Sequence, residues 1–125
     1  MFDGLRGMAG FAGLMKDLPR LRERMEMVKV ELGRERVTAE TGGGAVRATA
    51  DGMMRVISVE IEPALLAGLV EIEDADDRAL GQDLITGAVN QALERSREVA
   101  QRVVSEAAAD LGIPMPDIDM TRLLG

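Results

Sequence analysis

The 125-residue sequence predicts an α+β fold in which a long N-terminal helix, a three-stranded antiparallel β-meander and a long C-terminal helix follow one another. Three observations predict this order. Apolar residues recur every three or four positions near both ends of the chain, which is typical of helices. Residues 37–61 instead alternate between apolar and polar side chains, which is typical of strands. Glycines interrupt this alternation, and Pro63 ends it.

The first helix is predicted from Pro19 to Arg36. Apolar residues follow one another in steps of four and three, at Leu14, Leu18, Leu21, Met25, Val28 and Leu32. Proline fits the first turn of a helix but disfavours helix in the residue before it. We therefore expect residues 1–16, which are rich in glycine, to form a flexible leader or a kinked helix.

The meander has one apolar and one polar face. The apolar positions are Val37, Ala39 and Thr41 in the first strand, Val46, Ala48 and Ala50 in the second, and Ile57, Val59 and Ile61 in the third. The glycines at positions 42–44 supply a turn that is open to positive φ. Asp51-Gly52 is a hairpin signal between the second and third strands.

The long C-terminal helix is predicted from Asp76 to Asp110. One face carries Leu80, Leu84, Ala88, Ala92, Val99, Val103, Ala107 and Leu111. Residues 63–73 form a connector with a single helical turn, and Gly112 with the prolines that follow stops the long helix. The prediction is thus a leader over residues 1–16, one folded domain over 17–111 and a Pro-containing tail over 112–125.

The apolar faces of these helices are too long for a small sheet to cover, and the sheet has two edges to protect. We therefore expect a homodimer that is intertwined or paired through its sheets or helices.

Composition argues against catalysis and against bound groups. The chain has no Cys and no His, which removes thiol nucleophiles, imidazole bases and the common zinc ligands. The three glycines join two strands and do not open a helix, so they are not expected to bind phosphate. The acidic residues from Glu71 to Asp77 lack the pattern of a calcium loop and instead suit a helix N-terminus. We expect no enzyme, cofactor, metal, small-molecule substrate or membrane span.

Charge is divided unevenly. Residues 1–36 carry eight Lys/Arg and six Asp/Glu, a net charge of +2, whereas residues 37–125 carry seven and sixteen, a net charge of −9. Basic side chains of the first helix, with two from the sheet, are the candidates for phosphate contact. They are Arg20, Arg22, Arg24, Lys29, Arg34, Arg36, Arg47 and Arg55.

Three motifs in register resemble the YbaB/EbfC family of nucleoid-associated proteins. They are Gly42-Gly-Gly-Ala-Val-Arg-Ala-Thr-Ala-Asp-Gly52, Val59-Glu-Ile-Glu-Pro-Ala-Leu-Leu66 and Asp83-Leu-Ile-Thr-Gly-Ala-Val-Asn-Gln-Ala-Leu93. The termini Met1-Phe-Asp-Gly-Leu and Leu111-Gly-Ile-Pro are also similar to those of the family. Family members differ in having a Lys- and Gln-rich first helix and a Lys where Met53-Met54 stands here.

The resemblance implies a bacterial, cytoplasmic protein of the nucleoid. It implies a homodimer that binds double-stranded DNA through protruding helices with little sequence preference, with effects on nucleoid organisation and gene expression. The alternative is a non-catalytic scaffold of the same fold that has lost DNA binding and holds a protein partner. The scaffold would use its helices and the methionines Met25, Met27, Met53 and Met54.

Overall fold

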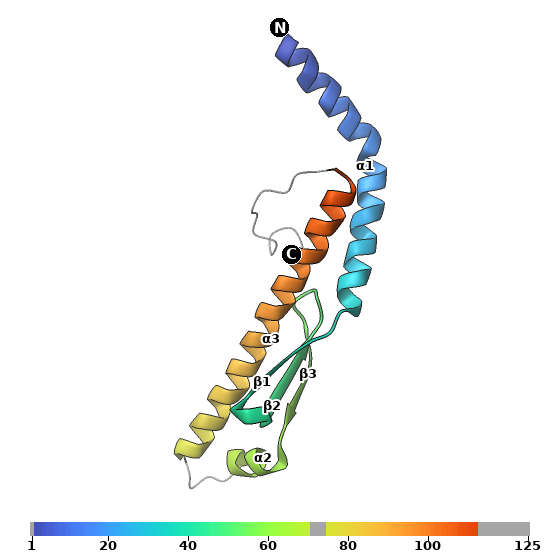
Figure 1. Ribbon diagram of the computed structural model, residues 1–125. Helices are drawn as coiled ribbons and strands as arrows, with labels where there is room; N and C mark the ends of the chain where they lie inside the picture. Colours follow the sequence, from blue (N-terminus) through green and yellow to red (C-terminus); the bar gives the residue numbers. More distant parts are fainter. Residues whose placement is uncertain (1, 71–74, 113–125) are drawn as a thin grey trace.

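The computed structural model describes residues 2–70 and 75–112, and residues 2–17 through their backbone. The elements follow in the order α1 (Phe2–Arg34), β1 (Val37–Thr41), β2 (Val46–Ala50), β3 (Val56–Ile61), α2 (Pro63–Val70) and α3 (Ala75–Asp110). Figure 1 shows the sheet against the N-terminal half of α3 and α1 beside its C-terminal half. The predicted order of long helix, meander and long helix in an α+β fold is confirmed.

The first helix is longer than predicted, because α1 begins at Phe2 and ends at Arg34. Pro19 lies inside it. Proline lacks an amide hydrogen and its ring crowds the preceding turn, so helices bend at such positions. Figure 1 shows this bend between the free N-terminal half of α1 and the half that lies beside α3. Because of the bend, the C-terminal half of α1 packs beside α3 while the N-terminal half extends away from it.

The strands pair antiparallel in the order β1-β2-β3, as the meander prediction requires. On the face toward α3, Ala39 stands opposite Ala48, and Ala48 stands opposite Val59. The alanines of β1 and β2 on this face are fully buried, as are Ala88 and Ala92 of α3. Because all these side chains are small, α3 can pack close to the first two strands.

The alternation predicted for the third strand is wrong at its start. A β-bulge shifts the register between β2 and β3, so that Val56, and not Ile57, stands opposite Ala50. A bulge sets two residues against one and breaks the alternation of faces. Val56, Ile57 and Val59 remain 42%, 48% and 39% exposed, so β3 has an apolar side that the described part of the chain leaves partly uncovered.

Both predicted turns are present, and glycine has a different role in each. Gly42, Gly43 and Gly44 all have positive φ, as expected. In the β2–β3 hairpin the left-handed residue is Met54, with φ 62°, and not Gly52. Gly52 is needed for space, because a Cβ there would lie 2.8 Å from the carbonyl oxygen of Leu32.

The side chain of Asp51 holds the hairpin tip in place. Its Oδ1 accepts hydrogen bonds from the backbone N–H groups of Met53 and Arg55, at 2.8 and 3.0 Å. The N–H of Met54 donates to the Oγ of Ser96 on α3 at 2.9 Å. The tip is therefore tied to α3 by Ser96 and to α1 by the amide of Gly52, which donates to the Leu32 carbonyl oxygen.

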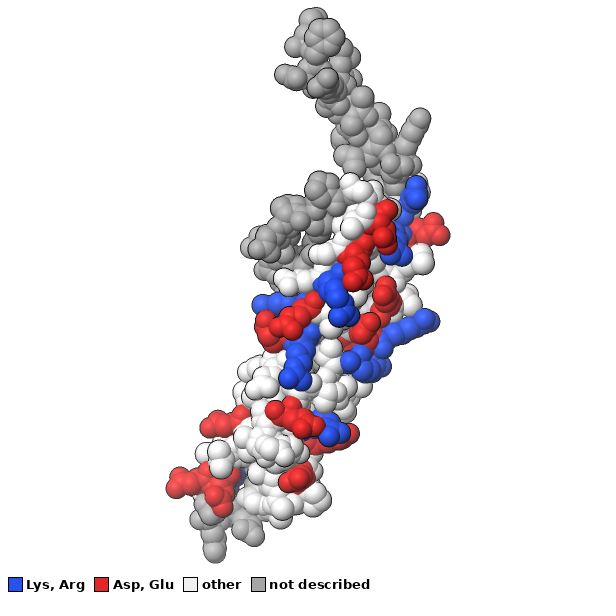
Figure 2. Space-filling model, in the orientation of Figure 1, with Lys and Arg blue, Asp and Glu red and all other residues white. Residues whose placement is uncertain are grey.

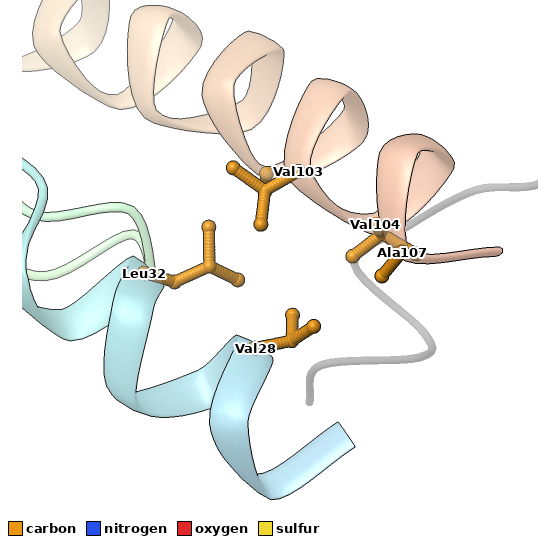
Figure 3. Close-up of a cluster of buried hydrophobic side chains, with 6 residues drawn as sticks. Val28, Leu32, Val103, Val104 and Ala107 are labelled. Atoms are coloured by element: carbon orange, nitrogen blue, oxygen red, sulfur yellow. The ribbon is translucent and has the colours of Figure 1, made fainter. Parts of the chain in front are cut away.

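The core has two parts. One lies between α3 and the sheet, and the other, which we call the helix cluster, joins α1 to the C-terminal half of α3. Figure 3 shows the helix cluster, in which side chains from the two helices point toward one another. Its buried members are Val28, Leu32, Ala100, Val103, Val104 and Ala107. Met53 packs against it from the hairpin tip, so the tip contributes both polar and apolar contacts.

The remaining predictions concern the connector and the long helix. The connector contains the two-turn helix α2 instead of a single turn. The long helix was predicted to within one residue, but Leu80 is 58% exposed and does not belong to its buried face. The next residue, Gly81, is buried where α3 meets α2. A Cβ there would lie 2.6 Å from the side chain of Leu69, so glycine allows the two helices to approach closely. The division into leader, domain and tail stays a prediction, and residues 113–125 of the tail lie outside the described residues.

Candidate nucleic-acid interface

The eight basic side chains proposed from the sequence fall into two groups. One group lies on α1, and the other lies on the sheet and its loops. The α1 group contains Arg20, Arg22, Arg24, Lys29 and Arg34, and the second contains Arg36, Arg47 and Arg55. The two groups differ in how many of their members already pair with other groups of the protein.

The three cations of the second group are bound within the chain. Arg47 forms an ion pair with Glu40 on the neighbouring strand, with 2.7 Å between Nη2 and Oε1. Arg55 donates from Nε to the buried carboxylate of Asp51 at 3.1 Å. Arg36 donates to two backbone carbonyl oxygens, of Gly33 and Glu35, near the end of α1. A phosphate would have to compete with these partners.

Two cations of the α1 group also have partners. Arg24 joins the end of α3 through an ion pair with Asp110, with 3.0 Å between Nη2 and Oδ2. Lys29 lies 3.7 Å from Glu26 one turn earlier. An exposed ion pair within one helix, such as that of Lys29 and Glu26, contributes little to stability, so Lys29 can leave it to bind another anion. Arg24 is different, because it connects two helices.

Three of the eight cations have no ion pair or hydrogen bond with the residues that the structure describes. They are Arg20, Arg22 and Arg34, all exposed on α1. Arg20 and Arg22 lie about two turns beyond the helix cluster, toward the free half of the helix. Arg20 and Arg22 can therefore bind phosphate without first breaking an ion pair or hydrogen bond with the described residues.

The sequence interpretation did not include the cations of the long helix among its candidates, because it placed the phosphate contacts on the first helix and the sheet. Arg95, Arg97 and Arg102 are exposed on the C-terminal half of α3, which packs beside α1. Arg95 donates to the backbone oxygen of Thr38, and Arg97 lies 4.0 Å from Glu94. These three arginines fall within eight residues, but the same half of the helix carries four acids, so a charge count alone would not have identified it as basic.

Charged side chains are unevenly distributed along the length of the molecule. Figure 2 shows blue and red side chains interleaved over α1 and the adjoining part of α3, whereas the face below, over the sheet, is mostly uncharged. The opposite end of α3 is acidic, with Asp76 and Asp77 in its first turn. Phosphates are repelled by an acidic end, so the cations of α1 and of the C-terminal half of α3 form the favoured surface.

The described residues meet the requirements of neither a three-ligand metal site nor a helical membrane span. Among residues 2–70 and 75–112, no three carboxylates, thiols or imidazoles are grouped so that they could hold a metal ion. Part of the acidic run, residues 71–74, lies outside the described residues. No helix in the described part of the chain is long and apolar enough to cross a membrane.

The methionines proposed for a scaffold role are mostly not on the surface. Met25, Met53 and Met54 are half-buried, and Met53 packs against the helix cluster. Met27 is the exposed one, at 55%. A methionine-lined binding surface built from all four is therefore not what the structure contains.

Comparison with known proteins gives a consistent result. The model of the YbaB/EbfC DNA-binding family matches residues 8–111. A nucleoid-associated protein of Chlorobium luteolum is 34% identical over 119 residues, which are 95% of this chain and 98% of that protein. One from Alkaliphilus metalliredigens is 31% identical over 113 residues, covering 90% and 93% of the two chains.

A solved structure supports the fold alone. The crystal structure of the uncharacterized protein HP0035 from Helicobacter pylori superposes with a TM-score of 0.53 and 18% sequence identity. The match covers 70% of this chain and 93% of that one.

Proposed function

The chain belongs to the YbaB/EbfC DNA-binding family, and from this membership we propose that it binds double-stranded DNA as a homodimer with little sequence preference. It is a nucleoid-associated DNA-binding protein in the sense of its relatives' names. The place of action that this family implies is the nucleoid in the bacterial cytoplasm, where the protein would influence DNA organisation and gene expression.

One observation supports the DNA contact most directly. Arg20 and Arg22 are exposed, have no ion pair with the described residues, and lie beyond the helix cluster, where α1 passes the end of α3. We call this end of the molecule the two-helix end. Arg102 is an exposed cation of α3 that lies beside the helix cluster, about two turns before the end of that helix. Side chains of this kind bind phosphates through charge, and phosphate contacts carry no sequence information. Little sequence preference follows from that chemistry.

The net charge of −7 limits how tightly DNA can bind. The acids of the sheet and of the first turn of α3 repel the duplex at long range. Two copies of the two-helix end, joined in one particle, would compensate because the second contact becomes intramolecular. A dimer is therefore part of the proposed mechanism.

The dimer contact is supported by the apolar side chains that α3 leaves uncovered on β3. Val56, Ile57 and Val59 lie on this strand, and Leu66 on α2 is 50% exposed. These side chains follow one another along β3 and the helix after it, and exposed apolar groups on a surface mark contacts between proteins. We propose that a second copy covers this β3 surface, which comprises these four residues.

A salt series of gel shifts tests the proposed function. The full-length protein is mixed with duplexes of unrelated sequence, and binding is measured from low to moderate salt. We expect similar affinities for all duplexes and a decline of log K with log salt, because each neutralised phosphate contributes about 0.9 to the slope. Absence of binding at low salt would contradict the proposal and favour the scaffold alternative.

A further inference from the structure

A second exposed apolar site lies on α1, away from the β3 surface. Four residues follow one another in steps of four, three and four: Glu23, Met27, Val30 and Arg34. At 100° per residue these positions share one sector of the helix, roughly 60° wide, on the side opposite the helix cluster. We call these four residues the outer strip.

The outer strip is open to solvent. Met27 and Val30 are 55% and 53% exposed, and a groove of about 640 Å³ is lined by this part of α1 and the two residues after it. Single exposed apolar residues are ordinary on protein surfaces. Here two of them are adjacent on one face of a helix, with a charge four residues before the first and another four residues after the second.

The charges make the outer strip self-complementary. Glu23 precedes Met27 by four residues, and Arg34 follows Val30 by four residues. A two-fold axis through the centre of the strip would place Glu23 opposite Arg34 of a second copy, and Met27 opposite Val30, on both sides of the axis. A parallel pairing would instead set Glu23 against Glu23 and Arg34 against Arg34. Charge therefore selects the antiparallel arrangement.

Nothing in the described part of the chain uses these charges. Glu23 and Arg34 are exposed, and neither has an ion pair with the residues that the structure describes. DNA does not fit the strip, because a carboxylate at one end and two apolar residues at the centre are unfavourable for phosphates. A second copy satisfies the two apolar residues and both charges.

We propose that the outer strip binds the outer strip of a second copy in antiparallel orientation, and that this contact joins one dimer to the next. It uses α1, whereas the β3 surface forms the dimer, so the two contacts together build assemblies larger than a dimer. Arg20 and Arg22 stay at the free end of the strip. The consequence that joined dimers bring DNA segments together rests on the proposed function, but the self-contact does not.

Cross-linking tests the orientation, because the chain has no cysteine of its own. Full-length variants Glu23→Cys and Arg34→Cys are prepared separately, oxidised alone or mixed, and run on a non-reducing denaturing gel. We expect a disulfide-linked pair in the mixture only, because antiparallel pairing leaves equivalent positions about 16 Å apart along the helix. No linked pair in the mixture, or equally strong pairs in each variant alone, overturns the proposal.

A charge swap tests the chemistry by sedimentation equilibrium. Glu23→Lys sets like charges opposite one another, and we expect roughly tenfold weaker association between dimers. The double variant Glu23→Lys/Arg34→Glu restores opposite charges and should recover the parental association. Parental association of the single variant, or no recovery in the double variant, overturns the inference. Neither measurement uses DNA, so a failure here is distinguishable from a failure of the proposed DNA binding.

Discussion

The backbone amide of Gly52 donates a hydrogen bond to the carbonyl oxygen of Leu32 over 2.8 Å, and so joins the tip of a hairpin to the end of α1. This approach is possible because Gly52 has no side chain. A Cβ there would lie 2.8 Å from that oxygen and 2.9 Å from Cδ2 of Leu32. The contact is therefore a direct test of how closely the sheet and the first helix pack.

Replacing Gly52 with Ala should lower the free energy of unfolding by about 1–3 kcal/mol, because the backbone of Leu32 must move away. Urea unfolding followed by circular dichroism measures the change. Gly33→Ala is the matched control, since nothing lies within 4 Å of a Cβ there and alanine favours the helix. Equal stability of the Gly52 variant and the parent would contradict the close approach.

Gly43 tests backbone conformation without a steric neighbour. Its φ is 67°, and a Cβ would have nothing within 4 Å. We expect Gly43→Val to lower the stability by about 1–3 kcal/mol through backbone strain. Gly43→Asn should cost less, since asparagine tolerates the left-handed conformation. If both variants cost the same, conformation is not the reason for the glycine.

The Asp51 carboxylate should be one of the most sensitive polar groups. It is 1% exposed and accepts hydrogen bonds from two backbone amides and from the Arg55 side chain. Asp51→Ala would leave the amides of Met53 and Arg55 without their acceptor, at a cost of about 1–3 kcal/mol. Arg55→Ala is the control and should cost less than about 1 kcal/mol, because that side chain is exposed. Thermal unfolding of the two variants decides which partner matters.

DNA affinity should depend on the unpaired cations of α1. The double variant Arg20→Ala/Arg22→Ala should weaken binding to all duplexes alike and reduce the salt slope by roughly 0.9 for each phosphate that is no longer neutralised. Arg47→Ala is the matched control, because Arg47 already pairs with Glu40 on the sheet. Fluorescence anisotropy over a salt series measures both. An unchanged slope in the double variant would move the DNA contact elsewhere, with Arg102 the next candidate.

The β3 surface should carry the dimer. Val59→Asp places a charge among apolar groups that we expect to be covered by the second copy, and an unpaired buried charge costs several kcal/mol. Light scattering should then show a monomer at micromolar concentration where the parent is a dimer. Ser58→Asp is the control, because its exposed side chain points to the polar face of the same strand. Dimers formed equally by both variants would argue against this surface.

The sequence was sufficient for the elements whose physics is local. Periodicity located the long helix within one residue of its start, and the glycines at 42–44 all adopt the positive φ that their turn requires. Pro19 was less informative, because a proline weakens a helix without always ending it. In α1 the helix continues through the proline to Phe2.

The errors concern tertiary contacts that no local pattern contains. Leu80 fits the helical period but lies at the end of α3 beyond the sheet, so little covers it. The bulge in β3 arises where the strand pairs with Ala50 of β2. The alternation of residues within β3 does not report how that strand pairs with its neighbour. Likewise, the ion pairs of Arg24, Arg47 and Arg55 removed three candidate cations that looked equivalent to Arg20 in the sequence.

The helix cluster has a consequence for the order in which the protein is assembled at the ribosome. Val28 and Leu32 are synthesised before their partners Val103, Val104 and Ala107, which follow more than 70 positions later. The hairpins of the meander can form from neighbouring residues as soon as these are available. The first helix must wait, with its apolar side exposed, until the last turns of α3 have left the ribosome. A chain that stops before residue 100 would therefore keep its sheet residues but present an unprotected helix to chaperones and proteases.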